Sequence, residues 1–403
     1  MESLGPELSL DAGAAVRADD RRVTRARWQD EAVTRSQRDA TAVAQDEVDR
    51  ATRAVEELRI RVLVFAVTVV RRIGPPVDVA CFAPQGVLDD LGVGGQSPPL
   101  SAVLDLHRCH DATVRVGVVY PHQEIGDDPA RIAAFAQAAE DLGYAHIVAY
   151  DHVVGAEPTG RPAGWKGAYT HRDAFHEPFV LFGYLAAVTK KLELAFGILI
   201  LPQRQTVLVA KQAATLDVLS RGRVRLGVAI GWNHVEYEAL GMSWRDRGKR
   251  IEEQIEVLRL LWTRELVDYA GRWHRIDRAG INPLPVQRPI PLWMGADEEV
   301  AVKRVARLAD GWFSHLAPNE EGRAALERFR QYVREAGRDR ARVGVEGRVG
   351  ATGAPEEWAR KAEIFREMGM SHLEFRTGGS KLPDLDAHID AMRRFREIAP
   401  VFD

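Results

Sequence analysis

The chain has 403 residues, 46% of them hydrophobic and 28% charged, with a formal net charge of −3. This composition is typical of a globular protein with one large domain or two average ones, and no dense basic run indicates a nucleic-acid partner. The two cysteines, Cys81 and Cys109, exclude a disulfide framework. No apolar run reaches the ~20 residues of a membrane span, and the N-terminus lacks a signal-peptide pattern. We therefore expect a cytoplasmic protein with no membrane partner.

Residues 1–113 differ in character from the rest of the chain. They contain no Lys, Asn or Tyr, and they are rich in Ala, Val, Asp and Arg. One interpretation is an irregular or helical N-terminal extension. The other is that this part is not native coding sequence, because Lys, Asn and Tyr need A/T-rich codons, and a GC-rich upstream region translated from a premature start would lack them. Mass spectrometry of the native N-terminus distinguishes the two.

From Val114 onward, apolar runs and helical patterns alternate regularly. The predicted strands are Val114–Tyr120, His146–Tyr150, Leu192–Ile200, Val224–Ile230, Ile290–Met294, Gly311–His315, Val343–Val349 and His372–Phe375. The predicted helices are Pro129–Leu142, Glu177–Thr189, Thr206–Leu219, Asp246–Leu261, Glu298–Leu308, Glu320–Ala336, Pro355–Met368 and Leu385–Ile398. Repeated strand–helix units over residues 114–403 predict a (β/α)8 TIM barrel. A doubly wound open sheet is the competitor, but the first strand is not followed by a GxGxxG turn.

Two connections are long for a compact domain. Val153–His176 follows the second strand, and Val267–Arg288 precedes the fifth and is predicted to be irregular. Connections of this length without secondary structure are often lids or binding loops.

The segment Leu192–Asn233 predicts a strand, a crossover helix and a second buried strand. In a parallel barrel the ligand site lies at the carboxyl ends of the strands. Gly197-Ile198 should lie there, and glycine within a strand marks a bulge, a close ligand approach or simply a tight bend. Ile230, Gly231 and Asn233 end the second strand. Asn233 either hydrogen-bonds a polar ring edge or caps the next helix.

The second predicted strand ends at Asp151 and His152. A histidine at the barrel mouth is suited to general acid–base chemistry. The alternative is an Asp that caps the following loop and a His that is merely exposed to solvent.

The fifth strand runs into Gly295-Ala296-Asp297, followed by two glutamates, and then a helix. A glycine turn before a helix can hold a phosphate, but the acidic residues there would repel one. His171, His176 and Glu177 form the other histidine-containing group, and their spacing does not place ligands on one face, so we expect no metal site. No nucleophile motif such as GxSxG is present.

Over residues 114–400 the chain resembles the luciferase-like flavin and deazaflavin oxidoreductases, and most closely the probable coenzyme F420-dependent oxidoreductases. The resemblance rests on ordered motifs: VRVGVVYP, Asp151-His152, the block from Glu177-Pro178-Phe179 through LPQR and AKQAATLDVLSRGR to GWN-x-x-E-Y, and Arg304-x-x-Arg307-x-x-Asp310-Gly311-Trp312.

The resemblance implies a (β/α)8 barrel with a flavin or deazaflavin ring across its mouth. It implies that Asp151 and His152 border the ring and that Gly197-Ile198 is a bulge, often with a non-proline cis peptide, behind it. It also implies that Ile230, Gly231 and Asn233 contact the ring or its ribityl chain, and that Gly295 and Ala296 approach its phosphate end.

Three residues depart from the family pattern. Tyr150 stands where a small Ser is usual, Ala229 replaces a common Gly, and Asp297 lies in a turn that usually carries Gly and Ser. The last departure bears on phosphate binding.

The resemblance therefore predicts hydride transfer between coenzyme F420 and a small organic substrate, with His152 as proton donor or acceptor and Asp151 orienting the ring or the imidazole. The first alternative is a two-component monooxygenase that uses reduced FMN and dioxygen. The second is a non-redox phosphate-binding barrel. We also expect a homodimer, and a flavin reductase or F420-reducing enzyme as functional partner.

Overall fold

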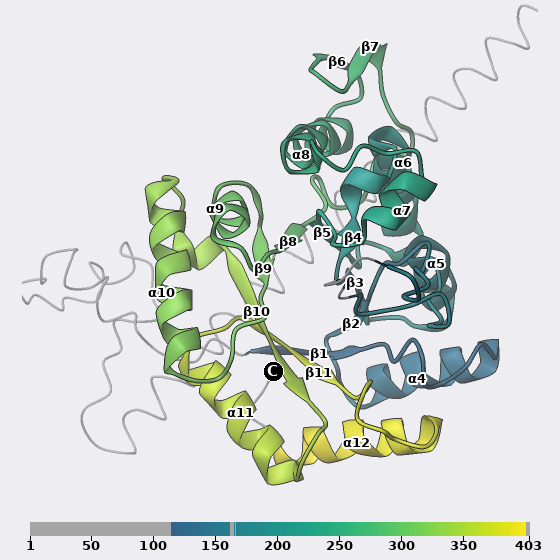
Figure 1. The fold of residues 1–403 in the computed structure, drawn as a ribbon, viewed down its shortest axis with the longest axis vertical. Helices are drawn as coiled ribbons and strands as arrows, with labels where there is room; N and C mark the ends of the chain where they lie inside the picture. Colours follow the sequence, from purple (N-terminus) through teal and green to yellow (C-terminus); the bar gives the residue numbers. More distant parts are fainter. Residues whose placement is uncertain (1–113, 162–164, 166, 400–403) are drawn as a thin grey trace, which may run out of the picture. The chain divides into compact units, whose positions relative to one another are not determined.

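The computed structural model describes residues 114–161, 165 and 167–399. The interpretations offered for residues 1–113 lie outside this part of the chain. The described residues form a closed parallel barrel surrounded by helices (Figure 1), which confirms the predicted fold class.

The barrel strands are β1 (Arg115–Val119), β2 (His146–Ala149), β3 (Glu193–Phe196), β4 (Leu199–Ile200), β5 (Val224–Ala229), β8 (Leu292–Gly295), β9 (Gly311–Phe313), β10 (Gly344–Gly350) and β11 (His372–Arg376). Neighbours follow the order β3-β2-β1-β11-β10-β9-β8-β5-β4, all parallel, and a further pairing of β3 with β5 closes the barrel. Since β3 and β4 are successive parts of one stretch of chain, the barrel has the eight strand positions that the sequence predicts.

One long helix follows each barrel strand position. These helices are α4 (Pro129–Asp141), α5 (Pro178–Val188), α6 (Thr206–Ser220), α8 (Arg247–Thr263), α9 (Glu299–Leu308), α10 (Glu320–Glu335), α11 (Pro355–Glu367) and α12 (Leu385–Ile398). Local chemistry sets several of their ends. Asp128 and Glu177 cap α4 and α5 by accepting backbone N–H bonds, with a proline at the first helical position of each. The predicted strands and helices are confirmed to within two residues.

Two predicted segments differ from the structure. The stretch Val267–Arg288 is not wholly irregular, because β6 (Val267–Ala270) and β7 (Arg275–Ala279) pair there as an antiparallel hairpin. The predicted strand Leu192–Ile200 is interrupted at Gly197-Ile198, whose peptide bond is cis. The sequence did not predict this hairpin, because most residues of β7 are charged and exposed and the strand therefore lacks an apolar run.

Hydrophobic side chains form two separate layers. The larger core lies between the strands and the surrounding helices. A smaller cluster fills the barrel interior and consists of Val119, Val148, Ala195, Trp293 and Phe313, with Tyr150 and Ile198 packed against it. No helix among the described residues is long and apolar enough to cross a membrane. The interior cluster forms the floor beneath the carboxyl ends of the strands.

Candidate functional site

A cavity of about 200 Å³ opens at the carboxyl ends of the barrel strands. Five of the predicted site residues line it: Asp151, His152, Gly197, Ile198 and Gly231. They come from β2, the interruption between β3 and β4, and the end of β5. We call this space the mouth cavity. It lies where ligands bind in barrels of this kind.

Asp151 connects the end of β2 to the next strand position. Its carboxylate accepts hydrogen bonds from the backbone N–H of Ile200, at 2.9 Å, and from the guanidinium of Arg204, at 2.7 Å. Burial raises the pKa of Asp151, and the neighbouring charge of Arg204 opposes that rise. The carboxylate is thus engaged by Arg204 and the backbone. Among the described residues it makes no hydrogen bond to the imidazole of His152, so of the two predicted roles of Asp151 the orienting of the coenzyme ring stays a prediction.

Glu236 orients His152 instead. His152 Nδ1 lies 3.4 Å from Glu236 Oε1, and the same oxygen accepts the backbone N–H groups of Val153 and Val154. Burial opposes ionisation of Glu236, yet the hydrogen bonds and the charge on His152 hold its pKa below the usual value. An ionised carboxylate can only accept, so in the neutral imidazole Nδ1 carries the proton and Nε2 is the nitrogen that can accept one. Glu236 is the Glu of the GWN-x-x-E-Y motif, so the sequence contained a pattern that pointed to this residue.

Aromatic rings surround His152. The ring centroids of Tyr169 and Phe175 lie 4.9 Å from that of His152, and Trp232 lies at 5.7 Å. Tyr169 and Phe175 belong to the long connection Val153–His176, which carries neither helix nor strand in its described residues. This loop therefore contributes to the site, in line with its length.

The wall opposite β10 and β11 has small or apolar residues. A Cβ on Gly197 would lie 2.2 Å from Val148 Cγ1, so only glycine fits there without a shift. Gly231 has φ +66°, and a Cβ there would meet Ile200 at 2.8 Å. Ile198 packs on the interior cluster. Gly197, Gly231 and the apolar side chains of Ile198 and Ile200 thus form one wall of the mouth cavity.

Ile230 and Asn233 do not line the mouth cavity. The carbonyl of Ile230 accepts the hydroxyl of Tyr237 at 2.6 Å. Asn233 is buried and caps α7 (His234–Ala239), with Oδ1 accepting Val235 N–H and Nδ2 donating to the Val154 carbonyl. Of the two roles considered for Asn233, the structure shows the cap.

Gly295 and Ala296 lie beside the mouth cavity. A Cβ on Gly295 would contact Ile198 at 3.2 Å. Ala296 lines a second cavity of about 360 Å³, which shares His315 with the first. Asp297 contacts His315 at 2.8 Å, and the hydrogen bond from His315 lowers the pKa of Asp297. Asp297 also precedes α9, so only Glu299 lies in the first turn of that helix, where the sequence suggested three acids.

The histidine-containing group around α5 does not come together as one site. His171 contacts Glu157, whereas Glu177 caps α5 and contacts Arg204. His176 lies near Tyr120. Among the described residues no group of three or more His, Cys, Asp or Glu side chains is arranged to hold a metal ion.

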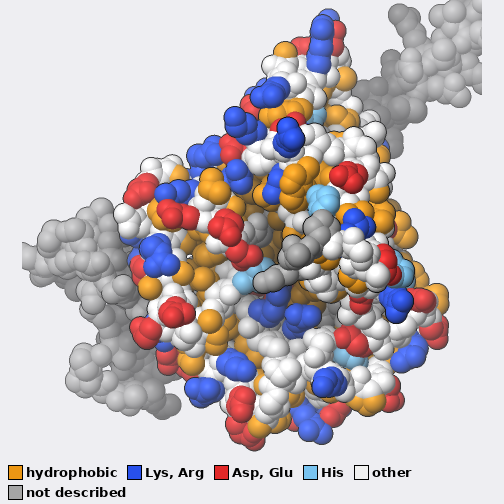
Figure 2. All heavy atoms as spheres, in the orientation of Figure 1, with side chains coloured by type: hydrophobic (Ala, Val, Ile, Leu, Met, Phe, Trp, Pro, Cys, Tyr) orange, Lys and Arg blue, Asp and Glu red, His pale blue; other side chains and the backbone are white. Residues whose placement is uncertain are grey.

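Sequence reasoning missed two arginines at the mouth cavity, Arg348 of β10 and Arg376 of β11. The signal was present as polar residues at every second position of two buried strands: Glu346 and Arg348, and Glu374 and Arg376. Figure 2 shows Lys or Arg side chains gathered in a hollow near the middle of the face it views, beside a histidine.

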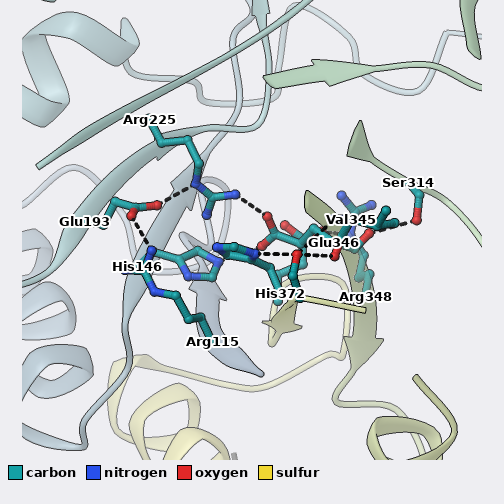
Figure 3. Close-up of polar contacts among 11 residues, drawn as sticks. Arg115, His146, Glu193, Arg225, Ser314, Val345, Glu346, Arg348 and His372 are labelled. Atoms are coloured by element: carbon teal, nitrogen blue, oxygen red, sulfur yellow. Dashed lines mark hydrogen bonds and ion pairs between the residues drawn. The ribbon is translucent and has the colours of Figure 1, made fainter. Parts of the chain in front are cut away.

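A charged network lies in the barrel interior (Figure 3). It lies nearer the amino ends of the strands than the interior cluster does, since His146 and Glu193 precede Val148 and Ala195 by two residues. Arg225 contacts Glu193 at 2.5 Å and Glu346 at 2.6 Å, and His146 contacts Glu346 at 2.6 Å. Burial opposes ionisation of both carboxyl groups, but the charge of Arg225 lowers the pKa of Glu193 to about 2 and holds that of Glu346 well below its usual range. The network joins β2, β3, β5 and β10 across the lumen.

The chain is similar in sequence to several known proteins. The chain is 36% identical over 208 residues to an uncharacterized protein of Mycobacterium tuberculosis, covering 50% of this chain and 71% of that one. It is 31% identical to an F420-dependent glucose-6-phosphate dehydrogenase of Nakamurella multipartita, covering 56% and 63%. It is also 31% identical to an FMNH2-dependent dimethylsulfone monooxygenase of Pseudomonas fluorescens, covering 45% and 50%.

Solved structures share the fold. A monooxygenase from Streptomyces bottropensis superposes with a TM-score of 0.60 at 18% identity, covering 70% of this chain and 98% of that one. A coenzyme F420-dependent tetrahydromethanopterin reductase from Methanopyrus kandleri gives 0.57 at 18% identity, covering 72% and 100%. The family model described as luciferase-like monooxygenase matches residues 110–398, and the chain therefore belongs to this family of oxidoreductases.

Proposed function

We propose that the chain transfers a hydride between the deazaflavin coenzyme F420 and a small organic substrate at the mouth cavity. The observation that carries the proposal is that Asp151-His152, Gly197-Ile198 and Gly231 line one cavity. The relative named as F420-dependent supports the choice of coenzyme.

The residues present fit a flat ring. Gly197 and Gly231 line the cavity with backbone, and Trp232 and Tyr169 line the same cavity. The hydroxyl of Tyr150 is buried and has no hydrogen-bond partner among the described residues, although Tyr150 lines the cavity. A ring bound on this wall can satisfy that hydroxyl through a polar edge. The coenzyme, when bound, supplies the hydride chemistry.

The chain itself supplies orientation and a proton acceptor. Removing a hydride from an alcohol carbon releases the hydroxyl proton, and Nε2 of His152 is available to accept it because Nδ1 faces Glu236. The rings of Tyr169 and Trp232 lie beside the imidazole and narrow the access of water to it. Asp151 holds the β2 end against Arg204 and so positions His152 next to it.

Gly295, Ala296 and the second cavity are proposed to hold the phosphate end of the coenzyme. The acidic residue in this turn, Asp297, is matched by His315, which reduces the repulsion that the sequence suggested. A phosphate here would also lie near the start of α9, where the helix has no side-chain cap.

The alternative coenzyme is reduced FMN with dioxygen as co-substrate, supported by the relative named as an FMNH2-dependent monooxygenase. Titration of the purified protein with F420 and with FMN, followed by fluorescence, separates the two. We expect saturable F420 binding that exceeds FMN binding. FMN binding without F420 binding would establish the alternative.

We also propose a homodimer, with an F420-reducing enzyme or a flavin reductase as functional partner. Support comes from α5 and α6, which pack side by side and leave apolar side chains in solvent. Val180 is 74% exposed, Leu208 51% and Leu219 67%. Large apolar side chains exposed on neighbouring helices are typical of interaction surfaces. Sedimentation analysis should give twice the monomer mass, and a monomer would contradict the proposal.

A further inference from the structure

The side of the mouth cavity opposite the glycine-rich wall is formed by β10 and β11. In the barrel order, β10 is separated from β3 by β2, β1 and β11, so the two lie across the lumen from each other. Arg348 pairs in register with Glu374, and Arg376 with Gly350. Arg348 and Arg376 both line the cavity, so two guanidinium groups face the wall proposed for the ring.

These two arginines are not equivalent. Arg348 forms an ion pair with Glu374, whose side chain is 3% exposed, and its guanidinium lies 5.7 Å from the ring centroid of Tyr150. The charge of Arg348 is therefore already matched within the protein. Arg376 has no hydrogen-bond or ion-pair partner for its side chain in the part of the chain that the structure describes.

The acidic side chains near Arg376 are engaged elsewhere. Asp151 accepts from Arg204, and Asp297 contacts His315. Glu124, which lies beside the loop after β11, accepts the backbone N–H of Gly379 at 2.6 Å. Among the described residues, the positive charge of Arg376 is consequently left without a matching acid, and its guanidinium is partly buried with its donors free. Such a group favours a carboxylate or phosphate, which it can bind through two parallel hydrogen bonds.

We propose that Arg376 binds an anionic group of the substrate, a carboxylate or a phosphate, and so selects small acidic substrates. This inference rests on the proposed function for its assignment to the substrate. The proposal is based on the two walls lying on opposite sides of the cavity. A ring bound on the glycine-rich wall has its other face exposed toward β10 and β11. A substrate held by Arg376 would lie between that face and the arginine.

The test uses inorganic phosphate as the probe and the full-length protein at low ionic strength, measured by calorimetric titration. We expect phosphate to bind the wild type, and binding to weaken by about ten- to a hundredfold in Arg376→Gln, since one charge-assisted pair is lost. Arg376→Lys keeps the charge but not the bidentate geometry and should recover part of the affinity. Arg360→Gln, on the exposed face of α11, is the matched control and should bind as the wild type does.

A second arm separates the substrate from the coenzyme as the source of the anion. Phosphate titration is repeated with saturating F420, and with FMN. Retained binding assigns Arg376 to the substrate, whereas complete displacement assigns it to the coenzyme and overturns the proposal. Equal phosphate affinity in the wild type and Arg376→Gln, or no binding to the wild type, also overturns it. If neither coenzyme binds but phosphate binding still depends on Arg376, the proposed function fails while the anion site stands.

Discussion

In the lower barrel interior, the guanidinium of Arg225 contacts two carboxylates, whereas at the mouth the guanidinium of Arg376 has no acceptor among the described residues. Both arginines point inward from strands of one barrel. The lower layer is closed off by the hydrophobic floor, so each charge there must be matched by protein. The mouth is open, so a charge there can be left for a ligand. The difference separates the part of the barrel that stabilises the fold from the part that binds.

The largest effect should follow from breaking the lower network. Arg225→Met leaves Glu193 and Glu346 without their shared cation, and we expect the free energy of unfolding to fall by about 3–5 kcal/mol. Urea denaturation measures it. Arg115→Met is the control, because Arg115 also contacts Glu193 but is 47% exposed, and it should cost less than about 1 kcal/mol. Equal losses in the two variants would mean that burial does not distinguish them.

At the mouth, the largest effect should be on catalysis rather than on stability. His152→Gln removes the proton acceptor, and we expect kcat to fall by about 10²–10⁴-fold with the unfolding free energy little changed. Steady-state kinetics of F420 reduction measures it. His171→Gln, a half-exposed histidine of the same loop, should retain full activity. Full activity in His152→Gln would remove His152 from the proposed chemistry.

The pH dependence of stability tests a buried group at the mouth end of the barrel, His122, which follows β1 and accepts the backbone N–H of Tyr150. Burial, with the nearby charges of His176 and His152, lowers the pKa of His122 to about 3. Below about pH 6.5 the unfolded chain binds a proton that the folded chain does not, so this residue costs about 1.4 kcal/mol of stability per pH unit as pH falls toward 3.

His122→Gln keeps an acceptor for Tyr150 and cannot titrate. The difference in unfolding free energy between pH 7 and pH 5 should therefore shrink by about 2 kcal/mol relative to the wild type. Urea denaturation at both pH values measures this. An unchanged difference would show that His122 is protonated in the folded protein.

The smallest effect concerns Asn233 and decides between its two roles. Asn233→Ala removes the cap of α7 and should cost about 0.5–2 kcal/mol, whereas Asn233→Ser restores an acceptor for the Val235 N–H and most of that stability. Both variants should bind coenzyme as the wild type does. A serine variant with native stability but tenfold weaker coenzyme binding would assign Asn233 to the ring.

Much of the fold could be predicted because the pattern is local. Helices begin at residues such as Asp128-Pro129 and Glu177-Pro178, and each strand is a short apolar run between them. The barrel-mouth location of Asp151 and His152 followed from the same pattern. The resemblance supplied the cis peptide at Gly197-Ile198, which the structure contains.

The rest depended on which strands face each other across the lumen. Arg225 contacts Glu193, which is 32 residues away in the sequence, and Glu346, which is 121 residues away. No local sequence pattern relates residues so far apart. The contact between His152 and Glu236 could not be predicted for the same reason: Asp151 is the sequence neighbour of His152, but Glu236, from the helix after β5, reaches its imidazole. Only the three-dimensional structure shows that the guanidinium of Arg376 has no acceptor among the described residues.

The central claim is that the mouth cavity holds the coenzyme ring. A crystal structure of the protein soaked with coenzyme F420 tests it most directly. We expect the ring against Gly197-Ile198 and Gly231, with His152 at its edge and Arg376 free on the opposite side. A ring bound away from this wall, or crystals that take up neither F420 nor FMN, would contradict it.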